Sequence, residues 1–372
     1  MTLEGEKMDN LKAGRQAGRQ AGRQSNIELL RMITAMGVIV LHYNNTGMGK
    51  GLVVSQGASN VFLWLLECLF VCAVNLFVLI SGYFLSSSQR RDCLKPLKLV
   101  VQVILFNEAF YLMSVIFGHN DLSLKHLIGA LIPCNWYVII YVGLYLISPY
   151  INVVLNYLHE NGGYKRFIVI ICATYSVYPI LVDILQVARG KEYMGLSTVG
   201  MYGSQAGYTI VNFIIMYVLG DALRRYDDKK TIGTRKVVLL MLLTLAVIFA
   251  WTYTEYHLIE SDTALEYCDP LVIAEAVLVF MIFSRLKFQS RAVNALAKGS
   301  FTVYLIHGYF LPHIQIQTFA AKELPMVAAH LIICVLVIYA VGLLVDWVYD
   351  KVMNPIWKSV DRKWVKHRKY AV

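Results

Sequence analysis

Charged side chains are scarce in this sequence. Of its 372 residues only 16% are Asp, Glu, Lys or Arg, while 58% are hydrophobic and the mean hydropathy is +0.56. About a quarter of the residues of an ordinary soluble domain are charged. The shortage of charge therefore excludes a soluble globular domain and indicates a membrane protein.

Paired metal-ligand spacing is also missing. The seven cysteines are scattered, and no pair combines zinc-ligand spacing with nearby histidines. We therefore expect no metal site. Most of the cysteines are expected to fill the core, with a disulfide between Cys134 and Cys268 as an alternative if the two helix ends that carry them are neighbours.

Long apolar runs are what the sequence does contain. A helix crosses about 30 Å of hydrocarbon with roughly 17 to 25 residues. Runs of this kind occur at 27–44, 61–86, 96–118, 135–156, 166–187, 207–225, 237–256, 269–286, 300–321 and 326–350. The predicted fold class is all-α, a polytopic membrane protein with about ten transmembrane helices. Because ten is even, both termini are expected on the same side.

The positive charges predict the orientation. Cytoplasmic segments of membrane proteins collect Lys and Arg. With the amino terminus inside, 28 of the 34 Lys and Arg residues fall in cytoplasmic segments, five fall outside, and Arg31 lies in the first run. Both termini are therefore predicted to be cytoplasmic. The net charge of +10 fits this topology and anionic lipid at the cytoplasmic surface, so it does not point to nucleic acid.

Three regions follow from these patterns. Residues 1–25 contain the repeat AGRQAGRQAGRQ, which is too polar and too short to form a core. We expect a disordered basic tail there, with a misassigned translation start as the alternative. Residues 26–351 form the predicted ten-helix transmembrane domain, and residues 352–372 form a basic cytoplasmic tail. A cleaved signal peptide is not expected, because Arg31 interrupts the first apolar run.

Two polar residues stand out in the first run. Arg31 and His42 are eleven residues apart, which corresponds to about 1,100° of helical rotation and about 16.5 Å along the axis, so both lie on one stripe. An ionisable group deep in a membrane costs roughly 2.5 to 3.5 kcal/mol on insertion scales and normally faces the bundle interior or a watery cavity. Glu28 can pair with Arg31. The alternative is that both side chains reach for the lipid headgroups.

The same spacing is part of a resemblance to a known family. The first span contains an Arg, ten residues and a His. Three further motifs are NLFVLISGYFL at 75–85, NWYVIIYVGLYLISPYI at 135–151 and FTVYLIHGYF at 301–310. From about residue 25 to about residue 349 the sequence resembles the integral-membrane acyltransferase-3 family. One departure is QRRDCLKP at 89–96, where the spacing of the basic residues and the proline is shifted.

The resemblance implies an enzyme. Members of this family move an acyl group, commonly acetyl, from a cytoplasmic coenzyme A thioester to an acceptor reached from the other side, often a sugar hydroxyl of a surface polysaccharide. We therefore expect an O-acyltransferase in the cytoplasmic membrane of a bacterium. The resemblance implies acyl-CoA, expected to be acetyl-CoA, as the donor substrate and a cell-surface or lipid-linked glycan as the acceptor, with no permanently bound cofactor.

Basic residues are the candidates for donor binding and catalysis. The phosphates of acyl-CoA need cations at the cytoplasmic mouth, and the candidates are Arg31, Arg90, Arg91 and Lys95. The positive-inside rule is the alternative explanation for these charges. His42 lies deeper and is the expected catalytic residue, with Arg31 binding the donor or orienting the site. His42 acts either as a general base on the acceptor hydroxyl or as the nucleophile of an acyl-imidazole intermediate.

Further residues are expected around the reacting groups. The thioester oxygen needs a hydrogen-bond donor as it becomes an oxyanion. Four side chains are candidates for that role, namely Asn75, Ser81, Tyr83 and Tyr304. The aromatic side chains of Trp136 and Tyr137 suit a sugar ring. His307, near mid-depth in the ninth run, is the second candidate histidine.

Three other interpretations each fit part of the sequence, and each has a feature against it. A glycan exporter or ion-coupled transporter would use buried Arg, Glu and His as a relay, but the sequence has no paired halves with broken helices. The stretch HLIESD at 257–262 matches the His-x4-Asp pattern of another acyltransferase class, yet it is predicted to lie outside, away from acyl-CoA. The motifs of the membrane-bound O-acyltransferase family do not accompany His42 or His307.

Overall fold

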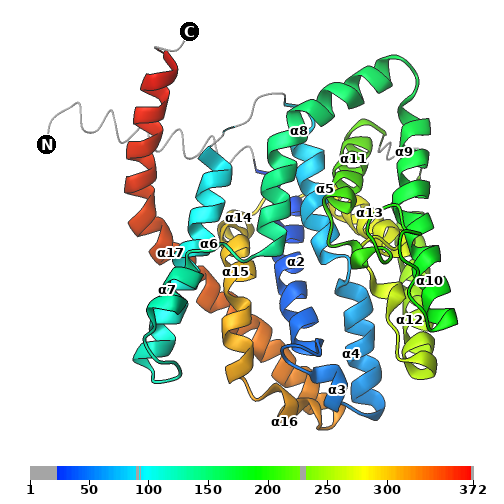
Figure 1. The fold of residues 1–372 in the computed structure, drawn as a ribbon, viewed down its shortest axis with the longest axis horizontal. Helices are drawn as coiled ribbons and strands as arrows, with labels where there is room; N and C mark the ends of the chain where they lie inside the picture. The colour runs from blue at the N-terminus through cyan, green and yellow to red at the C-terminus, as the bar shows by residue number, and fades with distance from the viewer. Residues whose placement is uncertain (1–22, 89–91, 93, 227–231, 370–372) are drawn as a thin grey trace, which may run out of the picture.

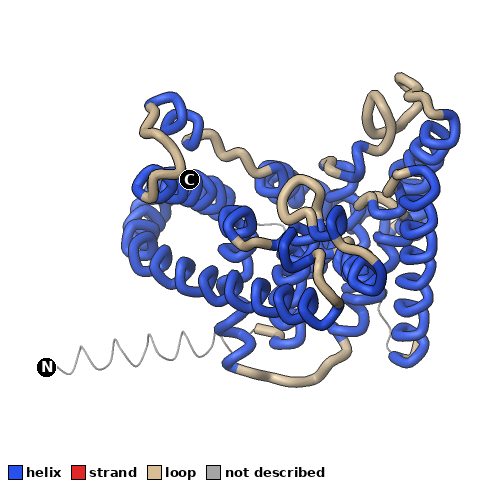
Figure 2. The backbone as a smooth tube through the Cα atoms, turned by 90° about the horizontal axis from the view of Figure 1, so that it is seen from below, coloured by secondary structure: helices blue, strands red, loops and turns tan. Residues whose placement is uncertain are grey.

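The structure of the protein is a computed structural model that describes residues 23–88, 92, 94–226 and 232–369, with side chains up to residue 362. The predicted amino-terminal tail lies outside the described residues except for its last three positions, and so do Arg90 and Arg91. Within the described ranges every regular element is a helix, and Figure 2 shows helices joined by loops. The all-α prediction is confirmed.

The helices follow one another along the whole described chain (Figure 1). The α-helices are α2 (Ser25–Asn44), α3 (Gly51–Val54), α4 (Gly57–Phe70), α5 (Ala73–Leu85), α6 (Leu94–Ile116), α7 (Leu124–Ala130), α8 (Trp136–Glu160), α9 (Tyr164–Cys172), α10 (Tyr178–Arg189), α11 (Ile210–Tyr226), α12 (Thr234–Ile259), α13 (Pro270–Ser284), α14 (Arg291–Leu296), α15 (Ser300–Phe310), α16 (Ile316–Ala320) and α17 (Leu324–Lys369). A π-helical turn, η1 (Ala173–Val177), joins α9 to α10.

Eight of the ten predicted spans coincide with described helices that are long and apolar enough to cross a membrane. The range 207–225 is an exception, because α11 has only 17 residues and carries several charges near its end. The range 300–321 is wrong as one continuous helix. There α15 has 11 residues and gives way to a 3-10 turn that contains Pro312, a residue with no amide N–H for an α-helical hydrogen bond.

The carboxyl-terminal helix is longer than the predicted final span. α17 contains 46 residues and runs without interruption past residue 351 to Lys369. Figure 1 shows it as the long orange-to-red helix at one side of the bundle. The described part of the predicted 352–372 tail therefore continues a membrane helix.

Helix α2 lies in the interior of the bundle (Figure 1). In its most apolar stretch 67% of the residues are buried, compared with 17% in α6 and in α12. One hydrophobic cluster includes Ile27 and Leu30 of α2, and a second cluster includes Ala35 and Ile39. Packing on both sides fixes the rotation of α2, and hence the direction of its polar stripe.

Helices α5 and α11 approach each other along their backbones. A Cβ atom on Gly82 would lie 2.2 Å from the carbonyl oxygen of Tyr217, and one on Gly220 would lie 2.3 Å from the carbonyl oxygen of Leu79. Only glycine fits at these two positions without a shift. Small residues allow such close packing of membrane helices, which gives a physical reason for the Ser-Gly-aromatic part of the 75–85 motif.

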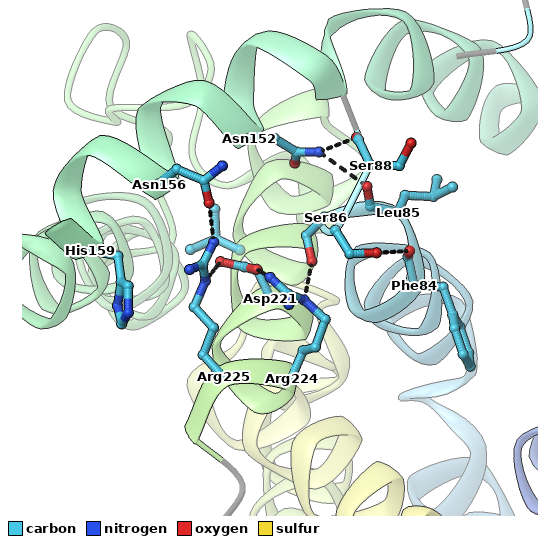
Figure 3. Close-up of polar contacts among 12 residues, drawn as sticks. Phe84, Leu85, Ser86, Ser88, Asn152, Asn156, His159, Asp221, Arg224 and Arg225 are labelled. Carbon is cyan, nitrogen blue, oxygen red and sulfur yellow. Dashed lines mark hydrogen bonds and ion pairs between the residues drawn. The ribbon is translucent and has the colours of Figure 1, made fainter. Parts of the chain in front are cut away.

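Hydrogen-bonded charges hold one end of this helix pair (Figure 3). Asp221 of α11 is fully buried and accepts hydrogen bonds from Arg224 and Arg225, each at 2.7 Å. Arg224 also donates to Ser86, directly after α5, at 2.9 Å. Asn152 of α8 donates to two backbone carbonyl groups of the same segment. The charges of α11 are thus paired, and the chain that leaves α5 is held in place.

The glycine contact gives a stability prediction. Replacing glycine by alanine inside a helix normally stabilises it by roughly 0.5 to 1 kcal/mol. We expect Gly82→Ala to lower the thermal unfolding midpoint of the detergent-purified protein instead, because the added Cβ meets backbone atoms. Gly143→Ala in α8 is the matched control, since nothing lies within 4 Å of its Cβ position. Equal shifts in the two variants would contradict the contact.

Candidate active site

Arg31 lies on the second turn of α2 and faces the bundle interior. Its Nη1 donates to the Glu28 carboxylate at 2.8 Å, which confirms the predicted pair. The guanidinium carbon also lies 5.8 Å from the ring centre of Phe84. Glu28 is 8% exposed and Arg31 is 35% exposed. The carboxylate therefore holds one edge of the guanidinium group and leaves the rest open.

That open part borders a cavity of about 280 Å³, which we call the arginine chamber. Four basic residues line it, Arg23, Arg31, Lys95 and Lys298, together with a single carboxylate, Glu28. They come from the segment before α2, from α2, from α6 and from the turn after α14. The surplus of positive charge suits an anionic ligand.

His42 lies three turns further along α2. Its Nδ1 is 2.9 Å from the carbonyl oxygen of Val38. A carbonyl can only accept, so Nδ1 carries the proton and Nε2 holds the lone pair of a neutral imidazole. The ring borders a second cavity, of about 450 Å³, which we call the histidine chamber. The basic nitrogen of His42 is thus available to a group bound in that chamber.

Aromatic rings and amides form the walls of the histidine chamber. The rings of Trp136 and Tyr267 are stacked with centroids 6.1 Å apart, and Tyr208 packs edge-on against Trp136 at 4.4 Å. Three side-chain amides also line it, those of Asn45, Asn107 and Asn135. None of its lining residues, all of them in the described part of the chain, is Lys, Arg, Asp or Glu. The chamber therefore offers flat faces and hydrogen-bonding groups without charge.

Three aromatic rings, from α5, α8 and α15, lie where the two chambers meet, and we call them the aromatic partition. The ring centroid of Phe77 is 6.3 Å from that of Tyr137 and 6.4 Å from that of Tyr304, and the two tyrosine rings are 5.2 Å apart. Tyr304 lines both chambers, while Phe77 and Tyr137 line the arginine chamber. Helix α2 therefore presents Arg31 to one chamber and His42 to the other, with the partition between them.

His307 of α15 joins His42 in the histidine chamber. The two imidazole rings meet edge to face, with centroids 4.6 Å apart and an angle of 67° between their planes. His307 is only 6% exposed. Two histidines that are 265 positions apart in the sequence are thus direct neighbours.

The remaining predicted site residues differ in where they lie. Ser81 lines the arginine chamber. Asn75 lines neither chamber. It is buried, and its amide donates to the carbonyl of Tyr267 at 2.7 Å, so it supports a wall of the histidine chamber. Tyr83 also lines neither chamber and packs with its ring centroid 5.0 Å from that of Phe280.

Several chamber residues were not singled out from the sequence. Arg23 and Lys298 were counted only as cytoplasmic charges, and Tyr208 carried no motif. Asn135 begins the quoted 135–151 motif, which was the available signal. Its Oδ1 accepts from the Val138 amide at 3.1 Å at the start of α8 and from the Tyr304 hydroxyl at 3.3 Å.

The described residues contain neither a metal site nor a disulfide between Cys134 and Cys268. Among them, no group of three or more His, Cys, Asp and Glu side chains is arranged to hold a metal ion. Cys134 and Cys268 are both free, so the alternative of a disulfide between them is wrong. Cys268 is buried, whereas Cys134 is exposed and lines the histidine chamber.

Comparison with known proteins decides the family. Residues 24–347 match the acyltransferase domain of the acyltransferase-3 family. The chain belongs to this family. No curated protein and no solved structure matches the chain. The acyltransferase-3 region extends from the start of α2 into α17, so it contains the histidine chamber, the aromatic partition and every residue that lines the arginine chamber except Arg23. The protein is a multi-pass membrane acyltransferase, and the exporter interpretation is set aside.

The exposed thiol of Cys134 allows a test of topology. A membrane-impermeant maleimide added to intact cells is expected to label Cys134, because the histidine chamber is predicted to open on the outer side. Cys134→Ser is the control and should lose this labelling. Labelling of Cys134 in inside-out vesicles but not in intact cells would reverse the predicted orientation.

Proposed function

We propose that the protein moves an acyl group, expected to be acetyl, from acyl-CoA in the arginine chamber to a glycan hydroxyl in the histidine chamber. One observation carries this proposal: the two chambers meet at Tyr304, and the single helix α2 presents Arg31 to one and His42 to the other. Donor and acceptor can then react from opposite sides of the cytoplasmic membrane of a bacterium, without either crossing it.

The charge of the arginine chamber supports acyl-CoA as the donor. Phosphate groups that leave water need cations, and Arg31 and Lys95 are two of the four basic residues that line this chamber. Arg90 and Arg91 precede Lys95 in the sequence and are proposed to add to the same set. The uncharged pantetheine arm can extend from the cations toward the partition, which brings the thioester to Tyr304.

The walls of the histidine chamber support a sugar as the acceptor. The rings of Trp136, Tyr208 and Tyr267 offer flat apolar faces to a pyranose. The side-chain amides of Asn45, Asn107 and Asn135 add hydrogen-bonding groups for sugar hydroxyls. Asn135 offers only its NH2 group, because its Oδ1 already accepts from Val138 and Tyr304. A glycan hydroxyl held there lies beside the free lone pair of His42.

The proposed reaction uses His42 as a general base. Its Nε2 takes the proton of the acceptor hydroxyl while the hydroxyl oxygen attacks the thioester carbon. Tyr304 is the proposed donor to the oxyanion, since it alone among the four candidates lines both chambers. Its hydroxyl proton, which bonds Asn135 Oδ1 at 3.3 Å in the resting structure, would turn to the oxyanion during the reaction. The carbon–sulfur bond then breaks, the coenzyme A thiolate leaves and takes the proton, and the ester remains on the glycan.

Loss of either polar residue of α2 is expected to stop the reaction. Arg31→Ala and His42→Ala should insert and fold but show no acceptor-dependent release of coenzyme A from acetyl-CoA, with a loss of roughly 10²- to 10⁴-fold for His42. His257→Ala, at an exposed position of α12, is the control and should keep full activity. Full activity of His42→Ala would refute the assignment. A stable acyl-His42 formed with donor alone would favour the covalent route.

The division of the site into two chambers predicts a split in kinetic constants. Trp136→Ala is expected to raise KM for the glycan acceptor and leave KM for acetyl-CoA unchanged, while Lys95→Ala should do the opposite. Steady-state kinetics with purified protein and isolated surface glycan measure both constants. The glycan of cells that lack the protein should lack one ester. Equal changes in both KM values for both variants would contradict the two-chamber assignment.

A further inference from the structure

His307 has an unused basic nitrogen beside His42. Its Nδ1 lies 2.6 Å from the carbonyl oxygen of Tyr304, so this nitrogen carries the proton. Its Nε2 is fully buried and has no hydrogen-bond partner among the described residues. A buried acceptor without a donor is unfavourable, so this nitrogen is expected to gain a partner at some stage of the reaction.

His330, a half-buried histidine elsewhere in the bundle, is a useful comparison because its ring has partners within the protein. His330 of α17 has its Nδ1 3.1 Å from the hydroxyl of Tyr43 and its ring stacked on Phe319 at 4.1 Å. The protein itself thus supplies His330 with a hydrogen-bond partner for its Nδ1 and with a stacking partner for its ring face. His307 differs because its Nε2 has no partner among the described residues, while its ring lines the histidine chamber beside a second imidazole.

His42 lacks the partner that a catalytic imidazole often has. In Ser-His-Asp sites a carboxylate bonds the Nδ1 of the histidine and stabilises the imidazolium ion that forms. Here the Nδ1 of His42 faces a backbone carbonyl, and no carboxylate lines the described chamber. The positive charge that His42 gains from the acceptor hydroxyl would therefore need another acceptor nearby.

We propose that His307 supplies that acceptor, so that the two imidazoles hold one proton between them during acyl transfer. The inference rests on the proposed function. In the resting state both Nε2 atoms carry lone pairs. When the acceptor hydroxyl loses its proton to the pair, one ring becomes an N–H donor and the other accepts from it in a charge-assisted hydrogen bond. The proton then passes to the coenzyme A thiolate, and the pair is neutral again.

Besides the two Nδ1 protons, the pair holds one additional proton and not two. Two imidazolium ions at this distance repel each other, and no anion lines the described chamber to offset them. A single shared proton also sets the order of events. The coenzyme A thiolate must take the additional proton before the next acceptor hydroxyl can give one up. Protonation of the thiolate is therefore coupled to the next attack.

The test compares variants of His307 in purified full-length protein, with acetyl-CoA as donor and the isolated surface glycan as acceptor. His307→Ala is expected to lower kcat by roughly 10²-fold and to leave both KM values unchanged. Added imidazole should restore part of this loss, since the vacated space opens on the histidine chamber. His307→Gln, whose amide oxygen can accept a hydrogen bond, should stay within about tenfold of the wild type.

Controls separate this role from a structural one. His313→Ala, at an exposed position beyond α15, should match the wild type. An unchanged kcat in His307→Ala, a raised acceptor KM alone, or a loss that neither imidazole nor glutamine relieves would overturn the proposal. If His307→Ala does not fold, the comparison of His307→Gln with His307→Phe decides in its place. Full activity of His42→Ala would instead overturn the proposed function itself.

Discussion

The site depends on the cost of leaving a polar side chain in contact with lipid. Arg31, Glu28 and His42 all belong to α2, and burying them in hydrocarbon without partners or water would be too costly. The fold meets this constraint by packing two hydrophobic clusters against other sides of the helix. The remaining stripe faces two hollow spaces. Once the rotation of α2 is fixed, the positions of the cation and the imidazole follow from helix geometry alone.

The helices next to α2 are positioned by residues that take no part in the proposed reaction. The backbone contact at Gly82 and Gly220 holds α5 against α11, and α5 supplies Phe77 of the aromatic partition. The hydrogen bonds of Asp221 secure the end of the same pair (Figure 3). A wider spacing between α5 and α11 would displace Phe77 from the other two rings of the partition.

Much of this arrangement was predictable from the sequence, because helix periodicity and apolar length are local properties. They gave eight of the spans, the common stripe of Arg31 and His42, and the pair of Arg31 with Glu28. The range 300–321 failed because an apolar run does not reveal where Pro312 interrupts the helix. Lys298 and Tyr208 were missed as site residues, since sequence spacing does not state which helices become neighbours. Asn75 is the opposite case: it was predicted as a site residue from its motif, but it lines neither chamber. Its amide donates to the backbone carbonyl of Tyr267, a residue of the histidine chamber wall.

The aromatic partition has a consequence for the energy balance of the cell. If the arginine chamber opens to the cytoplasm and the histidine chamber to the outside, as proposed, only a thin layer separates two aqueous solutions, and the membrane voltage falls mainly across that layer. In that arrangement the packed rings of Phe77, Tyr137 and Tyr304 would belong to this layer. A donor arm that passed between these rings would have to fill the opening itself, because protons would otherwise leak inward at every turnover. The width of a pantetheine chain thus sets how far the rings can separate while the membrane stays sealed.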